Sequence, residues 1–236
     1  MKLTCVAHSG FLVEGDDFVL VIDYYKESAD KAVGRLLERS TKKWYVLASH
    51  AHPDHFNPEV LSWEKNGREI QFVFSSDIRE LVPSRSPHIL FLDPGDCWQD
   101  DTVRIKAYGS TDLGVSFLID AGGKRLFHAG DLNNWHWKEE SAPEEVRASE
   151  AAYLKELEII AADVAEVDVA MFPLDPRLGA EYTLGAVQFL DRIRTHLFAP
   201  MHFWERYPKI HAFKPAVEQR GVRYADWTHT GETMEF

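Results

Sequence analysis

The stretch Ser49-His50-Ala51-His52-Pro53-Asp54-His55 decides how the rest of this sequence is interpreted. Within six residues it places three imidazoles and one carboxylate, the side chains that first-row transition metals take as ligands. If the segment turns, Asp54 and His55 point away from His50 and His52, so one short loop can serve two adjacent metal ions. Clusters of this kind at ligand spacing indicate a metal site rather than a solvated polar loop.

Apolar runs on both sides of this loop predict an α/β chain, with strands early and helices interleaved later. Trp44–Leu47 is a compact apolar run, so the loop follows the C-terminal end of a buried strand, where ligand-bearing loops commonly lie. The other predicted strands are Lys2–Ala7, Phe11–Glu14, Phe18–Ile22, Gln71–Phe74, His88–Leu92, Thr102–Tyr108, Gly114–Asp120, Arg125–His128, Val167–Phe172 and Leu197–Pro200. The predicted helices are Asp30–Arg39, Pro143–Ala165 and Thr183–Thr195. No linker or internal repeat separates them, so we expect a single domain over residues 1–236.

Composition and charge narrow the class of protein. The chain has 26 Lys and Arg against 38 Asp and Glu, a formal net charge of −12, which argues against a general nucleic-acid binder. Its two cysteines, Cys5 and Cys97, form no CxxC pair and suit a reducing cytosol. The longest clean apolar run, Phe18–Ile22, is far too short to span a membrane. We therefore expect a cytoplasmic protein with neither a nucleic-acid nor a membrane partner.

Several motifs, taken in order, give the chain a resemblance to the metallo-β-lactamase-fold hydrolases. Besides the Ser49–His55 loop they are Ala7-His8-Ser9-Gly10-Phe11-Leu12-Val13-Glu14, Val21-Ile22-Asp23, Phe127-His128-Ala129-Gly130-Asp131 and Ala199-Pro200-Met201-His202. The first of these is most similar to the branch that contains the L-ascorbate-6-phosphate lactonases. The resemblance covers essentially the whole chain and implies a four-layer αβ/βα sandwich with its metals at one edge between two sheets.

The resemblance also implies a ligand set and a cofactor. The implied ligands are His50 and His52 for a first metal ion, Asp54, His55 and His202 for a second, and Asp131 as a bridge between them. Two divalent ions are expected; zinc suits the imidazole and carboxylate set, and manganese and iron are compatible with the same ligands.

The chain departs from that family between the loop and Asp131. Most members supply a further histidine there, whereas this sequence has Tyr108-Gly109-Ser110-Thr111-Asp112-Leu113-Gly114 and no histidine between His88 and His128. Asp112 could ligate directly or lie in a turn or behind the ligands, and Ser110 or Thr111 could hold a water. A weaker, singly occupied or degenerate site is the alternative that this departure leaves open.

Other polar residues are candidates for roles around the ions. Asp54 could orient the attacking hydroxide, and His8 or His229 could act as the acid for the leaving group. The alternatives are a hairpin-turn histidine for His8 and a surface histidine for His229. Asp23 is expected to orient a metal-binding histidine, and His128 to lie behind the site. The remaining histidines without a motif are His88, His196 and His211.

Aromatic and cationic residues gather on two predicted loops. The aromatic groups are Trp135, His136 and Trp137 after the Asp131 strand, and Phe203, Trp204 and Tyr207 after His202. They could line a substrate pocket or belong to the core. Arg177 and Arg206 are the cations best placed in the sequence to meet an anionic substrate group, although a surface position is the default for arginine.

These observations predict a metal-dependent hydrolase that uses a metal-bridging hydroxide on a small ester, lactone or phosphoester. A phosphodiesterase or nuclease of the same fold is one alternative, but it would need a basic strip that the net charge speaks against. A non-catalytic metal-binding or ligand-sensing protein is the other, because of the missing histidine. A redox enzyme with a di-iron centre is less favoured than these two alternatives, since the sequence shows no flavin-binding domain. Metal content discriminates among them, with two ions per chain expected for the hydrolase.

Overall fold

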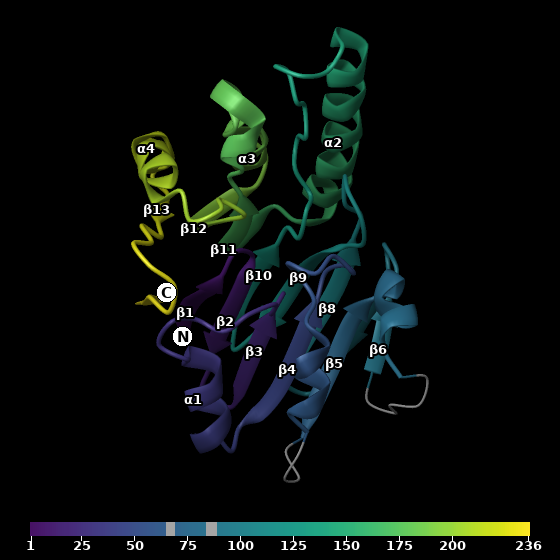
Figure 1. Cartoon of the computed structure of the whole chain (residues 1–236), viewed down its shortest axis with the longest axis vertical. Coiled ribbons are helices and arrows are strands. Elements are labelled where there is room, and N and C mark those ends of the chain that lie inside the picture. Colours follow the sequence, from purple (N-terminus) through teal and green to yellow (C-terminus); the bar gives the residue numbers. More distant parts are fainter. Residues whose placement is uncertain (65–68, 84–88) are drawn as a thin grey trace.

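Two β-sheets face each other across an apolar core in the computed structural model, which describes residues 1–64, 69–83 and 89–236 (Figure 1). The strands of the first sheet are β1 (Lys2–Ala7), β2 (Gly10–Glu14), β3 (Phe18–Ile22), β4 (Lys43–Ala48), β5 (Ile70–Ser75), β6 (Ile89–Leu92) and β14 (Thr233–Glu235). Those of the second are β7 (Cys97–Gln99), β8 (Val103–Tyr108), β9 (Ser116–Ala121), β10 (Lys124–His128), β11 (Glu166–Pro173), β12 (Arg194–Met201) and β13 (Arg223–Tyr224).

Each sheet is antiparallel in one part and parallel in the other. The first has the order β14-β1-β2-β3-β4-β5-β6, antiparallel up to β3 and parallel from β3 to β6. The second has the order β13-β12-β11-β10-β9-β8-β7, antiparallel from β7 to β10 and parallel from β10 to β13. As a result β1, β3 and β4 end at one edge of the first sheet, and β8, β10, β11 and β12 end at one edge of the second.

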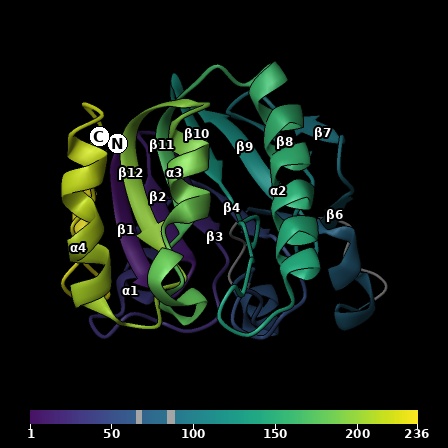
Figure 2. The same cartoon turned by 90° about the horizontal axis from the view of Figure 1, so that it is seen from above.

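The layers follow from which faces are apolar. The core between the sheets contains fully buried side chains from both, such as Phe11 and Leu47 from the first and Phe117 and Phe127 from the second. On the outer face of the second sheet, α2 (Pro143–Asp163), α3 (Leu184–Leu190) and α4 (Tyr207–Glu218) lie side by side (Figure 2). The outer face of the first sheet has its own apolar cluster, to which Val33 and Leu36 of α1 (Ala32–Arg39) belong. The predicted four-layer α/β sandwich is confirmed.

Most predicted elements are present with shifts of one or two residues at their ends, but the helix predicted over Thr183–Thr195 is wrong in its second half. There α3 stops at Leu190, and β12 begins at Arg194, because Arg194 pairs in parallel with Glu166 of β11. Tertiary pairing outweighs the local helical pattern here.

The sequence did not predict helix α4. It contains two prolines, which weaken the helical signal, but Pro208 lies in its first turn, where a missing N–H costs no hydrogen bond. The short strands β7, β13 and β14 were also not predicted. They have two or three residues each, too few for a periodic pattern. His88, the first residue of one predicted strand, lies outside the described residues. None of the helices in the described part of the chain has the length and apolar composition needed to cross a bilayer.

Candidate metal centre

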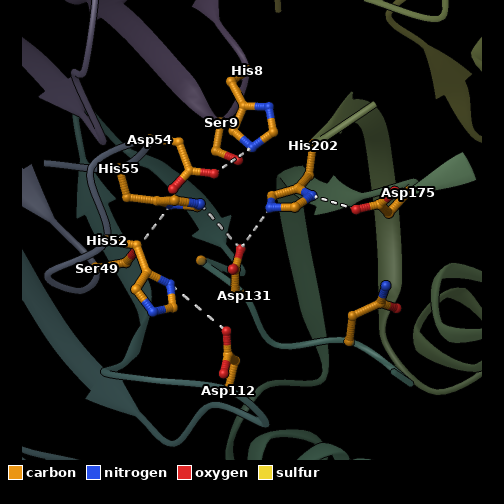
Figure 3. Close-up of polar contacts among 12 residues, drawn as sticks. His8, Ser9, Ser49, His52, Asp54, His55, Asp112, Asp131, Asp175 and His202 are labelled. Atoms are coloured by element: carbon orange, nitrogen blue, oxygen red, sulfur yellow. Dashed lines mark hydrogen bonds and ion pairs between the residues drawn. The ribbon is translucent and has the colours of Figure 1, made fainter. Parts of the chain in front are cut away.

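The candidate site lies where strand ends of the two sheets meet. The turn after β1 carries His8, β3 leads to Asp23, and the Ser49–His55 loop follows β4. From the second sheet, Asp131 follows β10 and His202 follows β12. The fold thus brings together histidines and carboxylates from segments nearly two hundred residues apart in the chain (Figure 3).

Asp131 is the centre of this cluster. Its Oδ1 lies 3.2 Å from His55 Nε2 and 3.4 Å from His202 Nε2, and its Oδ2 lies 3.6 Å from His50 Nε2. The ring of His50 is in turn close to that of His52, with 3.0 Å between Nε2 and Nδ1. A carboxylate among so many imidazole nitrogens is placed to share in binding a cation.

The potential ligand atoms form three overlapping groups, and within each group they lie within 4.8 Å of one another. The groups are His8, Asp54, His55 and His202; His50, His55 and Asp131; and His52, Asp112 and Asp131. All six metal ligands implied by the sequence are therefore brought together, and His8 and Asp112 join them. The division of the six between two ions remains a prediction, since the contacts form one continuous cluster.

Three atoms in this cluster are buried yet have no hydrogen-bond partner among the described residues: His8 Nε2, His55 Nε2 and Asp131 Oδ1. Asp54 Oδ2 comes within 3.3 Å of His8 Nε2, but not in hydrogen-bond geometry. Buried polar atoms are normally satisfied, and leaving one unpaired costs about 1–3 kcal/mol. Lone pairs that converge in this way, on imidazoles and carboxylates, fit divalent cations.

The Ser49–His55 loop is held in place from behind by the carboxylate of Asp23, which is fully buried. Asp23 accepts hydrogen bonds from Ser49 N–H (2.7 Å), Ser49 Oγ–H (2.6 Å) and His55 Nδ1–H (2.7 Å). Ser49 Oγ in turn lies 3.0 Å from His50 Nδ1. Because the Nδ1 atoms are engaged, the Nε2 atoms of both histidines face the centre, which is the tautomer that metal ligation needs. The role expected of Asp23 matches these contacts.

Asp175, on the opposite side, is the residue that the sequence analysis missed. Its fully buried carboxylate accepts a hydrogen bond from His202 Nδ1–H at 2.9 Å and others from Arg177 and Trp204 Nε1–H. It follows β11, so its position after a parallel strand of the second sheet is the signal that could have identified it.

Burial and neighbouring charges shift the pKa values of the cluster residues in different directions. Burial lowers the pKa of both His8 and His50 to about 4, which keeps them neutral. For His50 the neighbouring His55 adds to this effect, and for His8 the nearby carboxylate of Asp54 offsets it only in part. Burial alone would raise the pKa of Asp131, but His202 and His55 outweigh it and hold that pKa well below its usual range. For His55 burial also opposes the charged form, yet Asp131 and Asp23 prevail and raise its pKa to about 10. A positive charge is thus stabilised beside Asp131.

Two glycines allow the loops to approach this closely. Gly114 has φ +73°, and a Cβ there would lie 2.1 Å from the carbonyl oxygen of Ser49. Gly130, at φ +53°, would place a Cβ 2.9 Å from the Ser49 side chain. Any larger residue would push the histidine loop away from the second sheet.

The segment where the family histidine is missing has a definite arrangement. Thr111 Oγ1 donates to the carbonyl of Asn133 (2.6 Å) and accepts from its N–H (2.9 Å), which anchors the loop to the segment after Asp131. Ser110 Oγ accepts from the Asp112 N–H at 3.3 Å. Asp112 Oδ2 then lies 3.8 Å from His52 Nδ1. The Asp112 carboxylate is thus close to the cluster, and the hydroxyls of Ser110 and Thr111 are hydrogen-bonded to backbone groups.

Several other predicted residues lie away from the cluster. His229 has a side chain 68% exposed, and its contacts are with Thr228 and Glu232, so the structure does not bring it to the site. His128 is fully buried behind the site, where its Nε2–H donates to the carbonyl of Ser9 at 2.9 Å. Arg206 is exposed.

A cavity of about 350 Å³ opens over the cluster. Its walls include Asp54, Asp112, Asp131 and His202 together with three tryptophans and Arg177. The larger hollow of about 560 Å³ beside the β9–β10 turn is more open, and its lining contains no member of the cluster. The smaller cavity is therefore the candidate substrate site.

Comparison with known proteins gives four findings. The profile of the Beta-lactamase superfamily domain matches residues 2–146, more than half of the chain. The UPF0173 metal-dependent hydrolase of Desulforamulus reducens is 26% identical over 260 residues that cover both proteins fully. Among solved structures, Igni18, a metallo hydrolase from Ignicoccus hospitalis, superposes with a TM-score of 0.69 at 22% identity, covering 100% of this chain and 98% of that one. The diiron β-hydroxylase CmlA from Streptomyces venezuelae superposes with a TM-score of 0.67 at 14% identity over 100% of this chain and 54% of its own. These structural likenesses concern the fold.

Proposed function

The chain belongs to the beta-lactamase superfamily and is a metal-dependent hydrolase, and we propose that it binds two divalent metal ions and hydrolyses a small ester, lactone or phosphoester. The number of ions, their identity and the substrate are the proposed part. The buried His55 Nε2 and Asp131 Oδ1 carry the proposal, because neither makes a hydrogen bond to a described residue and bound cations are partners that satisfy both.

We assign the ligands from the clustered atoms. One ion would be held by His50, His52 and Asp131, with Asp112 as a fourth ligand in place of the family's histidine. Asp112 suits this role because the hydroxyl of Thr111, the other candidate in this segment, already donates a hydrogen bond to the carbonyl of Asn133.

The second ion would be held by Asp54, His55 and His202, with Asp131 shared between the two ions. Zinc suits the imidazole ligands. Manganese and iron are alternatives, because the site has three carboxylates when Asp112 is included.

The ions, when bound, lower the pKa of a coordinated water toward neutrality and polarise the scissile carbonyl or phosphoryl oxygen. The protein side chains position the proton transfers. Asp54 lines the cavity and can orient the attacking water. His8 lies beside it, 3.3 Å from its carboxylate, where its neutral imidazole can take up the proton of that water and then deliver it to the leaving group. His229 has no part in this scheme, because it is exposed and contacts Thr228 and Glu232 instead.

The substrate class rests on the size of the site and on the opening motif. A cavity of about 350 Å³ is at the small end of the range for ligand sites, so it suits a small molecule. The likeness of the Ala7–Glu14 stretch to the L-ascorbate-6-phosphate lactonase branch makes a lactone one member of the proposed class.

The proposal is tested by metal content and turnover together. Protein stripped with a chelator and reconstituted with zinc, manganese or iron is assayed for bound ions by mass spectrometry. Turnover is measured with 4-nitrophenyl acetate, γ-butyrolactone, 4-nitrophenyl phosphate and bis(4-nitrophenyl) phosphate. We expect two ions per chain and metal-dependent hydrolysis of at least one of the first three substrates.

Asp54→Ala and His55→Ala should each remove an ion and lower kcat by roughly 100-fold or more while the protein stays folded. His196→Ala is the matched control, because His196 is exposed and pairs with Glu166 outside the cluster. Wild-type turnover in both site variants after metal removal would refute the proposal. Two tightly bound ions without hydrolysis of any substrate would instead favour a ligand-sensing protein.

A further inference from the structure

The cavity over the metal centre has an arginine on its wall, and that side chain is held in one orientation. Arg177 is the only lysine or arginine among the described lining residues. Its Nε–H donates to both carboxylate oxygens of the buried Asp175, at 2.9 and 3.0 Å, and its backbone N–H donates to the same group. The Arg177 guanidinium carbon lies 4.6 Å from the ring centre of Trp204 and 5.8 Å from that of Trp137. The guanidinium is therefore fixed before any ligand binds.

Part of this guanidinium remains available. Arginine has five N–H donors, and Nη1 makes no hydrogen bond to a described residue. The side chain is 43% exposed and lines the cavity. A planar pair of donors at this position is suited to a carboxylate, which accepts two parallel N–H bonds.

The charge of the occupied centre does not oppose an anion. The cluster carboxylates Asp54, Asp112 and Asp131 contribute −3, the buried Asp23 behind His55 contributes −1, and two divalent ions of the proposed function would contribute +4, so the loaded centre has no net charge. Arg177 and Asp175 cancel each other in net charge but direct the guanidinium donors to the cavity.

The remaining wall is aromatic and rigid. The rings of Trp135 and Trp137 are nearly parallel, with 6.3 Å between their centres and 14° between their planes. Trp135 Nε1–H donates to the carbonyl of Asp131 at 2.8 Å, and Trp204 Nε1–H donates to Asp175 at 3.2 Å. With these two N–H groups bonded to the protein, the indoles of Trp135 and Trp204 present apolar faces to a ligand.

We propose that this cavity selects small aromatic carboxylates, with Arg177 binding the carboxylate and the tryptophan wall binding the flat ring. The inference rests on the proposed hydrolase function, whose substrate it narrows to esters or lactones that carry such a group. Trp137 and Arg177 are the specificity-determining residues.

Binding tests this inference without relying on turnover. Benzoate and its uncharged analogue benzamide are titrated calorimetrically into the zinc-loaded protein, together with acetate. We expect benzoate to bind at least roughly tenfold more tightly than either benzamide or acetate. Arg177→Gln should remove the preference over benzamide, Arg177→Lys should keep part of it, and Trp137→Leu should weaken benzoate and benzamide alike.

Arg206→Gln is the matched control, because Arg206 is exposed and is not a lining residue; it should leave every affinity unchanged. A carboxylate that binds only to the ions would be insensitive to Arg177→Gln, so an unchanged benzoate affinity in that variant overturns the inference. Equal affinity of the wild type for benzoate and benzamide overturns it too, even if both arginine variants fail to fold.

Turnover separates this inference from the proposed function. If the wild type hydrolyses phenyl acetate and 4-acetoxybenzoate, kcat/KM should favour the second, and Arg177→Gln should abolish that advantage. Absence of any hydrolysis would count against the proposed function alone, since the benzoate affinities decide the question of selectivity. Hydrolysis of both esters at equal kcat/KM would sustain the proposed function and overturn the selectivity.

Discussion

Replacing Asp175 by asparagine should weaken one metal site without unfolding the protein. The Asp175 carboxylate is fully buried, and its Oδ2 accepts hydrogen bonds from His202 Nδ1–H at 2.9 Å, from Arg177 Nε–H at 2.9 Å and from Trp204 Nε1–H at 3.2 Å. Asparagine has the same shape but a single acceptor oxygen. Depending on its orientation, His202 either keeps a neutral acceptor or faces an NH₂ group that repels its proton.

The size of the effect follows from these two orientations. A hydrogen bond to a charged group contributes about 1.5–3 kcal/mol and a neutral one about 0.5–1.5 kcal/mol, so the first orientation costs about 1–1.5 kcal/mol. That loss is roughly tenfold in affinity. In the second orientation the His202 tautomer is wrong for ligation, and the loss approaches the roughly 100-fold seen when a residue that orients a metal-binding histidine is lost.

Competition with a chromophoric zinc chelator measures this affinity for the ion that His202 binds. Arg177→Gln separates the two functions of Asp175, because it leaves the bond to His202 intact and should keep metal affinity within about twofold. Asp226→Asn is the matched control, since its carboxylate pairs with Lys214 and lies 3.5 Å from His211, outside the metal centre. If Asp175→Asn binds zinc as tightly as the wild type, the orienting role of Asp175 is wrong.

The remaining predictions concern metal removal, backbone fit, pH and packing. Removal of the ions should lower the melting temperature, as scanning calorimetry with and without chelator would show, because unpaired buried atoms lose their partners; an unchanged value would contradict the metal fit. Gly114→Ala should destabilise the protein to urea by more than about 1 kcal/mol. Gly123→Ala, which has the same φ of +73° but no atom within 4 Å of its Cβ, is the control for backbone strain, and equal losses would exclude the clash. Lys43 and two backbone N–H groups outweigh burial and lower the pKa of Asp100 to about 2, below an unfolded value of about 3.9. The stability that Asp100→Asn removes should therefore be constant above about pH 5 and should vanish as the pH falls toward 2, in urea titrations of the chelated proteins. Phe127→Ala, in the core between the sheets, should cost about 3–5 kcal/mol, and a loss below 1 kcal/mol would contradict its full burial.

The local parts of the metal centre could be predicted because they are contiguous in the sequence. His50, His52, Asp54 and His55 lie in one loop, and that loop follows an apolar strand, so their clustering needed only a turn. The ligand role of Asp131 came from family resemblance, and the structure places this residue in the middle of the cluster. The helix predicted over Thr183–Thr195 was wrong at its end because parallel pairing with β11, rather than local pattern, decides where β12 begins.

The sequence by itself determined which kinds of metal-ligating side chain are present. It has a loop of histidines and carboxylates, an excess of acidic residues, and apolar strands that directly precede the ligand residues. Only the tertiary structure decided which distant residues join them. It set Asp175 behind His202 and Arg177 between two indoles, because the ends of parallel strands meet at one edge of the sheet. It also kept His229 on the surface, although in the sequence His229 resembled His8 as a candidate acid. Residue types and local spacing can be read along a chain, but contacts between distant segments depend on the strand pairing that closes the sandwich.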